Sequence, residues 1–416
     1  MSPSGGPQPE DAAGAPPNAG LGRPLRVVDL TAFYGEKAGG IRTYLDAKQR
    51  WARTEPGIEH TLVIPGVSAN STDERVEVPS INVVATNGYR APLGWKALRA
   101  VLVERQPDVV IAHEPFWAAR GLPKLLAGTG IRTVAVHHGA VGHDARSIPG
   151  PFGFWSRVLS REFHRVYRDF DAIMAAIDTE PEFGLPSRIP LRFGLDPVFA
   201  PDPAALQAYL GGDSSGAAPG TGRSDEVLYV GRIAAAKSVE DLIRAAALSE
   251  EPWPLRLIGV GPAKSRMQRL ARSEGIEGRV TFEEFVSDRA ELARRYRRAS
   301  AVVLPGRWET FGLAAYEGAA SGASVACCAT AGSLATIDGL AQTFPEGPHG
   351  GPGSAGAATR ARNVLDAIER ARSATPDLQR AASLAASSSW EHALRAELTH
   401  LRALAAEPVA VRTPVA

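Results

Sequence analysis

Short apolar runs alternate with amphipathic segments from residue 25 onward. The first run, LRVVDLTAF, begins at Leu25, and after a glycine-containing loop the segment IRTYLDAKQRWA places Ile41, Tyr44 and Leu45 at helical spacing. The same order recurs further on, with strands predicted at 60–65, 107–114, 131–138 and 171–177, and helices predicted at 94–106, 117–128 and 151–170. Strands that alternate with helices predict a parallel sheet covered on both faces.

A second series of the same kind begins at residue 226. Strands are predicted at 226–232, 254–261, 279–285, 301–306 and 323–328, helices lie between them, and two or three more helices follow the low-complexity loop 346–359. The fold class is therefore α/β, with two doubly wound, Rossmann-like domains that face each other across a cleft. Ligands of such open sheets bind beyond the carboxyl ends of the strands, so candidate chemistry is sought in those loops.

The predicted domain boundaries follow changes in composition. The Pro-, Gly- and Ala-rich residues 1–24 are expected to form a disordered tail. An N-terminal domain is predicted at 25–195, a linker at 196–225, a C-terminal domain at 226–387, and a final helix and tail at 388–416.

Composition removes several classes of protein. Among 416 residues, 46 basic and 45 acidic side chains leave a net charge of +1, so no global field draws the chain to nucleic acid. The sequence contains no run of about 18 apolar residues, so no transmembrane helix is predicted. The adjacent Cys327 and Cys328 are expected to be buried small hydrophobes, and no metal-ligand spacing is present. Without an export signal, a cytoplasmic location is expected.

The strongest motif pairs Glu309 with Glu317, eight residues later. It follows the predicted strand AVVLP, and Phe311, Gly312 and Leu313 stand just before a helix, where backbone N–H groups are free. Carboxylates accept hydrogen bonds from vicinal hydroxyls such as those of a sugar. The alternative interpretation is that both are surface carboxylates, because helix starts favour acidic residues in any case. The succession of strand, turn and helix around them favours a ligand site.

Two glycine-containing loops carry the second and third motifs. Gly231 and Arg232 follow the strand VLYV, and Lys237, one of only six lysines, follows them. This pair of cations suits a diphosphate. Gly39 and Gly40 precede the first helix, where backbone N–H groups can hold a phosphate, although such a pair is also a routine tight connection. A further pair, Gly259 and Gly261, is only a partial glycine-rich motif.

Histidines end two strands that are expected to lie side by side. His113 ends one strand, and His137 and His138, followed by Gly139, end the next. A lone histidine more often has a structural role. Because two neighbouring strand ends carry histidines here, a functional role for the His137–His138 pair is favoured.

Helix 151–170 is amphipathic, with a row of arginines opposite an aromatic face. Packing of the aromatic face on the sheet is the favoured interpretation. Docking of the arginine row on a membrane surface is the alternative. The row comprises Arg157, Arg161, Arg165 and Arg168.

Taken in order, the Gly-Gly loop, the strand-end His-Gly, GR…K and E-x7-E with FGL resemble glycosyltransferase family 4. That resemblance implies the GT-B fold and a retaining, metal-independent transfer from a nucleotide-diphosphate sugar, with no cofactor. The segment FYGEKAGGIRTYL most resembles actinobacterial mannosyltransferases that extend phosphatidylinositol mannosides. It favours GDP-mannose as donor, an acceptor glycan or lipid, and peripheral contact with the inner face of a membrane.

The resemblance also implies roles for single residues. Arg232 and Lys237 resemble the cations that hold the leaving diphosphate, and Glu317 resembles the acid that binds the ribose. Glu309, with the N–H groups of residues 311–313, resembles the clamp on the donor sugar. Gly40 resembles the N-terminal-domain contact to the phosphate. His138 resembles the histidine near the donor sugar, with His137 as the alternative.

Some segments depart from the family pattern. Glu284 stands where the family usually has glycine, GASVACC lacks the usual proline, and AGSLATIDG replaces a Gly-Gly-x-x-Glu segment. These departures leave the base of the nucleotide open. They also motivate one alternative function, a non-catalytic binding relative. A sugar-nucleotide epimerase of the same fold, which would also need cations for the diphosphate, is the other alternative.

Overall fold

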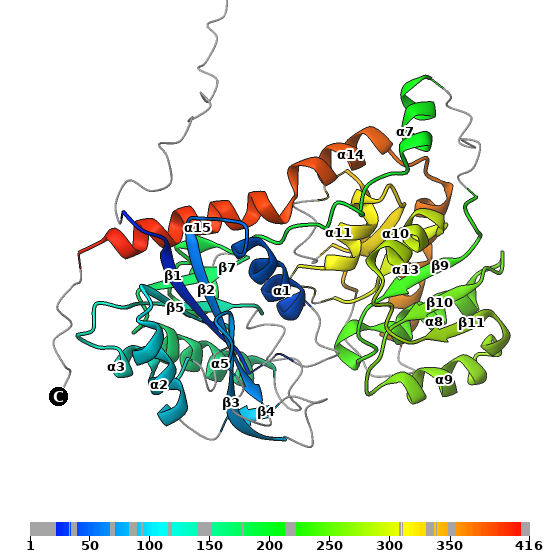
Figure 1. The fold of residues 1–416 in the computed structure, drawn as a ribbon. Helices are drawn as coiled ribbons and strands as arrows, with labels where there is room; N and C mark the ends of the chain where they lie inside the picture. Colours follow the sequence, from blue (N-terminus) through cyan, green and yellow to red (C-terminus); the bar gives the residue numbers. More distant parts are fainter. Residues whose placement is uncertain are drawn as a thin grey trace, which may run out of the picture.

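The computed structural model contains two α/β domains, each built on one sheet (Figure 1). It describes residues 22–32, 34, 40–66, 71–82, 90–92, 95–114, 119–139, 152–176, 179–212, 222–307, 309, 311–329, 337, 339–347 and 355–408. Gly39 and most of the predicted tail, residues 1–21, lie outside these ranges. Arg23, within the predicted tail, forms a bidentate ion pair with Asp108 at 2.8 and 2.6 Å, so the N-terminal domain already includes this residue.

The N-terminal sheet has eight strands in the order β4-β3-β2-β1-β5-β6-β7-β8. Neighbouring strands are parallel except β3 and β4. The strands are β1 Leu25–Leu30, β2 Ile58–Gly66, β3 Arg75–Asn82, β4 Arg90–Pro92, β5 Val109–Ala112, β6 Arg132–His137, β7 Ala172–Ala175 and β8 Ile189–Pro190.

Helices cover both faces of this sheet, because its central strands are apolar on both sides (Figure 1). Helices α1 (Gly40–Ala52) and α15 (Trp390–Ala406) pack on one face. On the other face lie α2 (Trp95–Arg105), α3 (Leu122–Leu125) and α5 (Phe152–Tyr167), with α6 (Glu180–Phe183) beside α5.

The C-terminal sheet has six parallel strands in the order β11-β10-β9-β12-β13-β14. They are β9 Val227–Val230, β10 Leu255–Ile258, β11 Val280–Glu283, β12 Ala301–Leu304, β13 Val325–Cys328 and β14 Ala341–Phe344. One face packs against α8 (Val239–Leu248), α9 (Lys264–Ser273) and α13 (Ala355–Ser373). The other packs against α10 (Arg289–Arg298), α11 (Leu313–Ala320) and α14 (Leu378–Ser387).

The chain passes between the domains twice, and the two passages lie side by side. Leu195 and Ser389 form a parallel bridge, and the N–H of Leu195 donates to the carbonyl of Ser388 at 2.6 Å. A Cβ on Gly194 would lie 2.3 Å from Cα of Trp390, so only glycine fits at this contact. After the second passage α15 returns along the N-terminal domain (Figure 1), where it buries Leu394, Leu398 and Leu401.

Several elements differ from the sequence predictions. Strands β3, β4, β8 and β14 were not predicted, and α7 (Pro203–Leu210) stands inside the predicted linker, capped by the carboxylate of Asp202. Of the helix predicted at 117–128, the described part is helical only at α3, because Gly121 and Gly128 adopt φ of 79° and 77°. Cys327 and Cys328 are buried, as predicted. Within the described ranges no helix is long and apolar enough to cross a membrane.

Candidate active site

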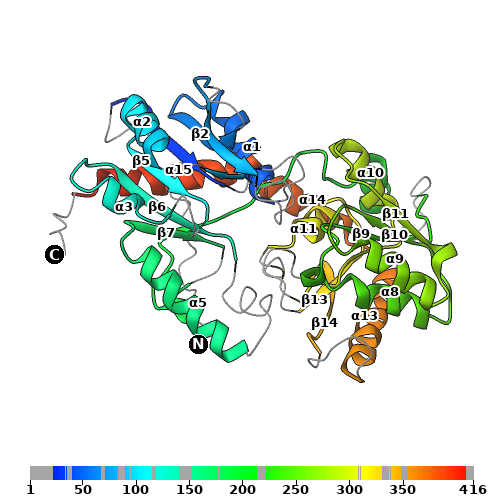
Figure 2. The ribbon, with the colours of Figure 1, turned by 90° about the horizontal axis from the view of Figure 1, so that it is seen from below.

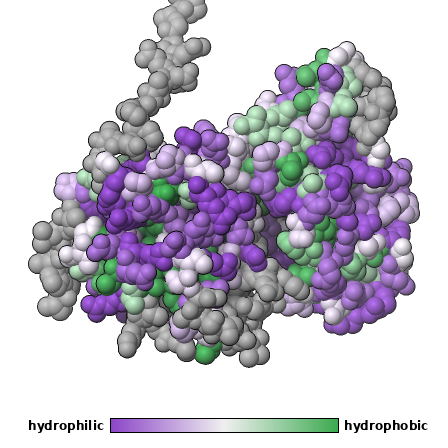
Figure 3. Space-filling model, viewed as in Figure 1, coloured by the Kyte–Doolittle hydropathy of each residue, from purple (hydrophilic) through white to green (hydrophobic). Residues whose placement is uncertain are grey.

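Each sheet reverses its strand order at one point, and the motif residues gather there. In the C-terminal sheet the reversal lies between β9 and β12, whose carboxyl ends lead to Arg232 and to Glu309. In the N-terminal sheet it lies between β1 and β5, and His113 follows β5 directly. Such reversals open a crevice where α/β proteins bind their ligands. The surface is hollowed between the two domains (Figure 3).

Lys237 and Glu309 form an ion pair at the C-terminal reversal. Nζ of Lys237 lies 2.7 Å from Oε1 of Glu309, and their side chains are 27% and 14% exposed. Arg232 is exposed on the same loop, and its carbonyl accepts a hydrogen bond from Tyr229 at 2.8 Å. Burial, and then the charge of Glu309, raise the pKa of Tyr229 well above its ordinary value. Tyr229 therefore stays neutral and keeps the backbone of Arg232 in place.

Gly259 and Gly261 hold this loop from behind. A Cβ on Gly259 would lie 2.0 Å from the carbonyl oxygen of Gly231, and one on Gly261 would lie 2.1 Å from that of Ile233. The N–H of Gly231 donates to the carbonyl of Ile258, the last residue of β10, at 3.0 Å, and the N–H of Ile233 donates to that of Val260 at 2.9 Å. The partial glycine motif thus has a packing role, which brings two backbones into contact.

The two domains meet at the start of α11. Gly312 is the N-cap of this helix, with φ 71° in the left-handed region. The first N–H groups of the helix point toward this N-terminal end. A Cβ on Gly40 would lie 3.2 Å from Cδ1 of Leu313, and the rings of Phe193 and Phe311 lie 4.4 Å apart. The structure therefore brings Gly40 and residues 311–313 together across the domain boundary.

Glu317 is buried inside the C-terminal domain. Arg289 donates to its Oε1 at 2.7 Å and Tyr296 donates to its Oε2 at 3.0 Å. Burial raises the pKa of Glu317, although Arg289 and Tyr296 oppose this shift. Arg289 also contacts Asp196 at 2.9 Å. A ribose that binds Glu317 must therefore share the carboxylate with Arg289 and Tyr296.

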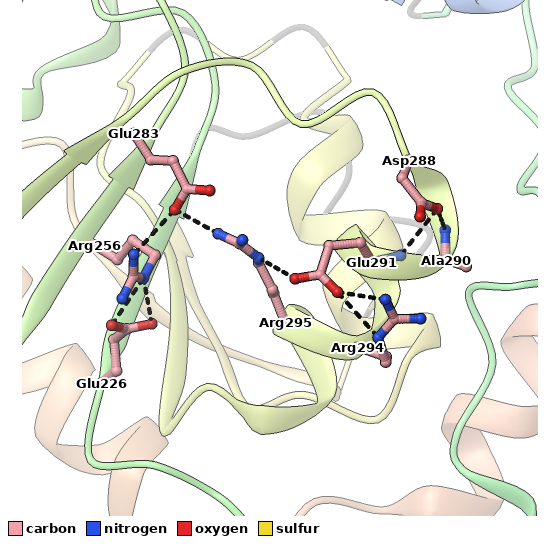
Figure 4. Close-up of polar contacts among 8 residues, drawn as sticks. All are labelled: Glu226, Arg256, Glu283, Asp288, Ala290, Glu291, Arg294 and Arg295. Carbon is pink, nitrogen blue, oxygen red and sulfur yellow. Dashed lines mark hydrogen bonds and ion pairs between the residues drawn. The ribbon is translucent and has the colours of Figure 1, made fainter.

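Helix α10, which supplies Arg289 and Tyr296, is fixed to the sheet by a ladder of ion pairs (Figure 4). Distances from donor nitrogen to acceptor oxygen along the ladder are 2.5–3.0 Å. Asp288 caps the helix by accepting from the N–H groups of residues 290 and 291. The ladder runs in the order Glu226, Arg256, Glu283, Arg295, Glu291 and Arg294.

The two histidines that follow one another in sequence point to opposite faces of the N-terminal sheet. His138 lies on the α1 side, where its Nε2 is 3.0 Å from Nδ1 of His113. His137 packs instead among Phe163, Tyr167 and Phe183, and burial lowers its pKa to about 4. Only His138 therefore shares a face with His113.

Helix α5 divides into a packed part and an exposed part. Phe163 and Tyr167 belong to the core under the sheet, which agrees with the favoured interpretation of its aromatic face. Near its N-terminus Phe154 and Val158 are 52% and 38% exposed, and the arginines of the predicted row are all exposed. Figure 2 shows this end of α5 extending from the N-terminal domain.

Comparison with known families decides the assignment. A model described as "Glycosyltransferase Family 4" matches residues 38–177, and one described as "Glycosyl transferases group 1" matches residues 219–342. The chain is therefore a glycosyltransferase, with a family 4 domain followed by a group 1 domain. The expected resemblance and the expected GT-B fold are thereby confirmed.

Individual relatives of this glycosyltransferase support the same assignment. It is 27% identical over 322 residues to a GDP-mannose-dependent alpha-(1-6)-phosphatidylinositol dimannoside mannosyltransferase of Mycobacterium tuberculosis, covering 72% of this chain and 78% of the relative. Two solved structures share its fold. Sucrose-phosphate synthase from Thermosynechococcus elongatus has a TM-score of 0.61 and 17% identity, with 92% and 96% of the two chains covered. The structure of Anabaena HepE in complex with UDP-glucose has a TM-score of 0.57 and 14% sequence identity, with 92% of this chain and 100% of the HepE chain covered.

Sequence reasoning missed the groups that support these residues. Arg289 and Asp29, which contact Glu317 and His113, belong to no short motif. Lys48 is completely buried beside Asp29, at 2.8 Å. Its rarity as a lysine, together with its place on the inward face of the first helix, was the available signal.

Proposed function

We propose that this glycosyltransferase moves a hexose, mannose favoured, from a nucleotide-diphosphate sugar to an acceptor hydroxyl with retention of configuration. The observation that carries the proposal is the meeting of Arg232, Lys237 and Glu309 at one strand reversal, with Gly40 and the start of α11 beside them. Charge develops on the diphosphate as the glycosidic bond breaks. Fixed cations in a closed site stabilise that charge without a metal ion.

Each group has a role in this proposal. Arg232 and Lys237 hold the diphosphate, and the N–H groups at the start of α11, which carries no side-chain cap among the described residues, face the same region. Glu309 accepts hydrogen bonds from sugar hydroxyls, while its pair with Lys237 keeps its side chain oriented. Glu317 accepts from the ribose, and His138 lies on the N-terminal side near the donor sugar. The acceptor hydroxyl attacks from the face that the diphosphate leaves.

The donor is proposed to be GDP-mannose, because the mycobacterial relative is named for that donor. Anabaena HepE is named in complex with UDP-glucose, so a uridine donor is the alternative. The acceptor is proposed to be a glycolipid or another glycoconjugate. Exposed Phe154 and Val158 beside the exposed Arg157 and Arg161 support peripheral contact of α5 with a membrane that carries such a lipid.

The decisive experiment offers purified protein a set of nucleotide sugars, with and without acceptors, and analyses the products. Transfer from one donor, with retained configuration at the new bond, is expected. Conversion of the nucleotide sugar without any acceptor would identify an epimerase instead. Thermal stabilisation by a nucleotide sugar without any turnover would identify a binding protein.

A further inference from the structure

A buried chain of hydrogen bonds links His138 to the centre of the N-terminal sheet. Nδ1 of His113 is 3.0 Å from Nε2 of His138, and Nε2 of His113 is 2.6 Å from Oδ1 of Asp29. Asp29 and His113 are 0% and 1% exposed. Because β1 and β5 are neighbours, Asp29 on one strand and His113 at the end of the other come within reach.

Titratable side chains from three other elements lie around Asp29. Lys48 on α1 and His60 on β2 contact its Oδ2 at 2.8 and 2.6 Å. Lys48 also contacts Glu397 of α15 at 2.6 Å, and Glu397 accepts from Tyr44 at 2.5 Å. Burial opposes ionisation of Asp29, but Lys48 and the hydrogen bonds from the two histidines hold its pKa well below the ordinary value.

An ionised carboxylate only accepts hydrogen bonds, so Nε2 of His113 must carry a proton toward Asp29. One proton then lies between Nδ1 of His113 and Nε2 of His138. When His113 is neutral, His138 donates this proton and its Nδ1 is an acceptor. In the other arrangement His113 carries protons on both ring nitrogens and donates instead, and a neutral His138 carries its own proton at Nδ1.

Burial lowers the pKa of His138 well below its ordinary value, and the neighbouring His113 and His137 add to this shift. His138 therefore stays neutral, and only the position of its proton changes. We propose that Asp29 and His113 are positioning residues that orient the ring of His138 and determine whether its Nδ1 accepts from the donor sugar or donates to it. This inference rests on the proposed function, in which His138 lies near that sugar.

His60 provides a matched control. Its Nε2 contacts Asp29 at the same 2.6 Å as that of His113, and the residue is buried, but its contact is with Oδ2 and leads away from His138. In either position glutamine keeps an N–H group near the place of Nε2 and removes the imidazole ring. His113→Gln breaks the contact with His138, whereas His60→Gln leaves it.

The kinetic test compares these variants over a range of pH. His113→Gln is expected to lower kcat at least about tenfold, in the range of general acid–base effects, with donor KM nearly unchanged and the pH profile shifted. His60→Gln should keep the wild-type pH profile. The double variant His113→Gln/His138→Gln should be no slower than His138→Gln alone. Equal losses in the two single variants, with unshifted pH profiles, would overturn the inference.

A second measurement uses the wild-type protein and needs neither activity nor a folded variant. Nitrogen NMR of labelled imidazoles should show His113 and His138 changing together in one pH transition, and independent transitions would overturn the proposal. If wild type transfers sugar and His113→Gln equals it, the positioning role fails and the proposed function stands. If wild type transfers from no donor, the proposed function fails, and the NMR titration still decides the coupling.

Discussion

Nζ of Lys237 lies 2.7 Å from Oε1 of Glu309, so an ion pair joins the loops that follow β9 and β12. Both side chains are only partly exposed, and Arg232 stands on the same loop as Lys237. The pair places a cation and a carboxylate at one strand reversal.

Lys237→Ala is expected to lower kcat/KM for the donor at least about tenfold, because a charged hydrogen bond in a closed site contributes roughly 2–4 kcal/mol to the transition state. Steady-state kinetics would measure the loss. Lys124→Ala, which removes an exposed lysine of α3, is the control and should match wild type. A Lys237→Ala variant with wild-type kcat and KM would exclude its role.

Excess chelator should leave the transfer rate unchanged, because Arg232 and Lys237 can neutralise the diphosphate themselves. The measurement is the initial rate with and without EDTA after extensive dialysis. Loss of activity that magnesium or manganese restores would contradict the expectation.

Gly259→Ala should weaken both donor binding and stability. Its Cβ would lie 2.0 Å from the carbonyl oxygen of Gly231, and its φ of 144° disfavours alanine, so the loop that carries Arg232 must move. Donor KM and thermal unfolding report the two effects. Gly278→Ala is the control, since no atom lies within 4 Å of its added Cβ. Unchanged KM in Gly259→Ala would show that the loop position does not matter.

His137 should make the protein less stable in weak acid. Burial lowers its folded-state pKa to about 4, so the unfolded chain, with a pKa of about 6.5, binds more protons between these values. Stability is therefore lost as pH falls from about 6.5 toward 4, by up to roughly 3 kcal/mol. Urea unfolding at several pH values should show a weaker acid dependence for His137→Phe. The exposed His400→Gln should behave as wild type, and equal slopes in all three proteins would refute the assignment.

Binding of α5 to anionic vesicles should fall with salt and with Arg157→Glu plus Arg161→Glu, since each arginine near such a surface contributes about 1 kcal/mol. Co-sedimentation with anionic vesicles at several salt concentrations measures this binding. Arg269→Glu plus Arg272→Glu on α9 makes the same charge change at exposed positions and should leave binding intact. If wild type ignores anionic vesicles, the membrane contact is wrong, while the transferase proposal stands.

The sequence predicted best the features that depend on residues close together in the chain. Alternating strands and helices predicted both domains, and Arg232, Lys237 and Glu309 could be placed at strand ends. Local patterns could not show that β9 and β12 would be neighbours, although that pairing creates the ion pair. They also could not distinguish His137 from His138, because the answer depends on which face of β6 meets the aromatic residues of α5.

Contacts between distant segments were beyond such reasoning. Arg289 and Glu317 are 28 residues apart and Lys48 and Glu397 are 349 apart, so no spacing rule relates them. The ion-pair ladder on α10 also joins residues that are distant in sequence. In the sequence its charges resemble an ordinary solvated surface, and only the pairing of β9, β10 and β11 brings them into line.

The return of α15 makes the N-terminal domain discontinuous in sequence. A fragment that ends at residue 195 would leave Leu45 and Leu62 without the apolar side chains of α15 and would remove Glu397 from Lys48. Such a fragment should aggregate when expressed alone and be rescued by co-expression with residues 388–408. Domain exchange with a relative must therefore carry the last helix along with the first domain, or the hybrid will combine two halves of mismatched cores.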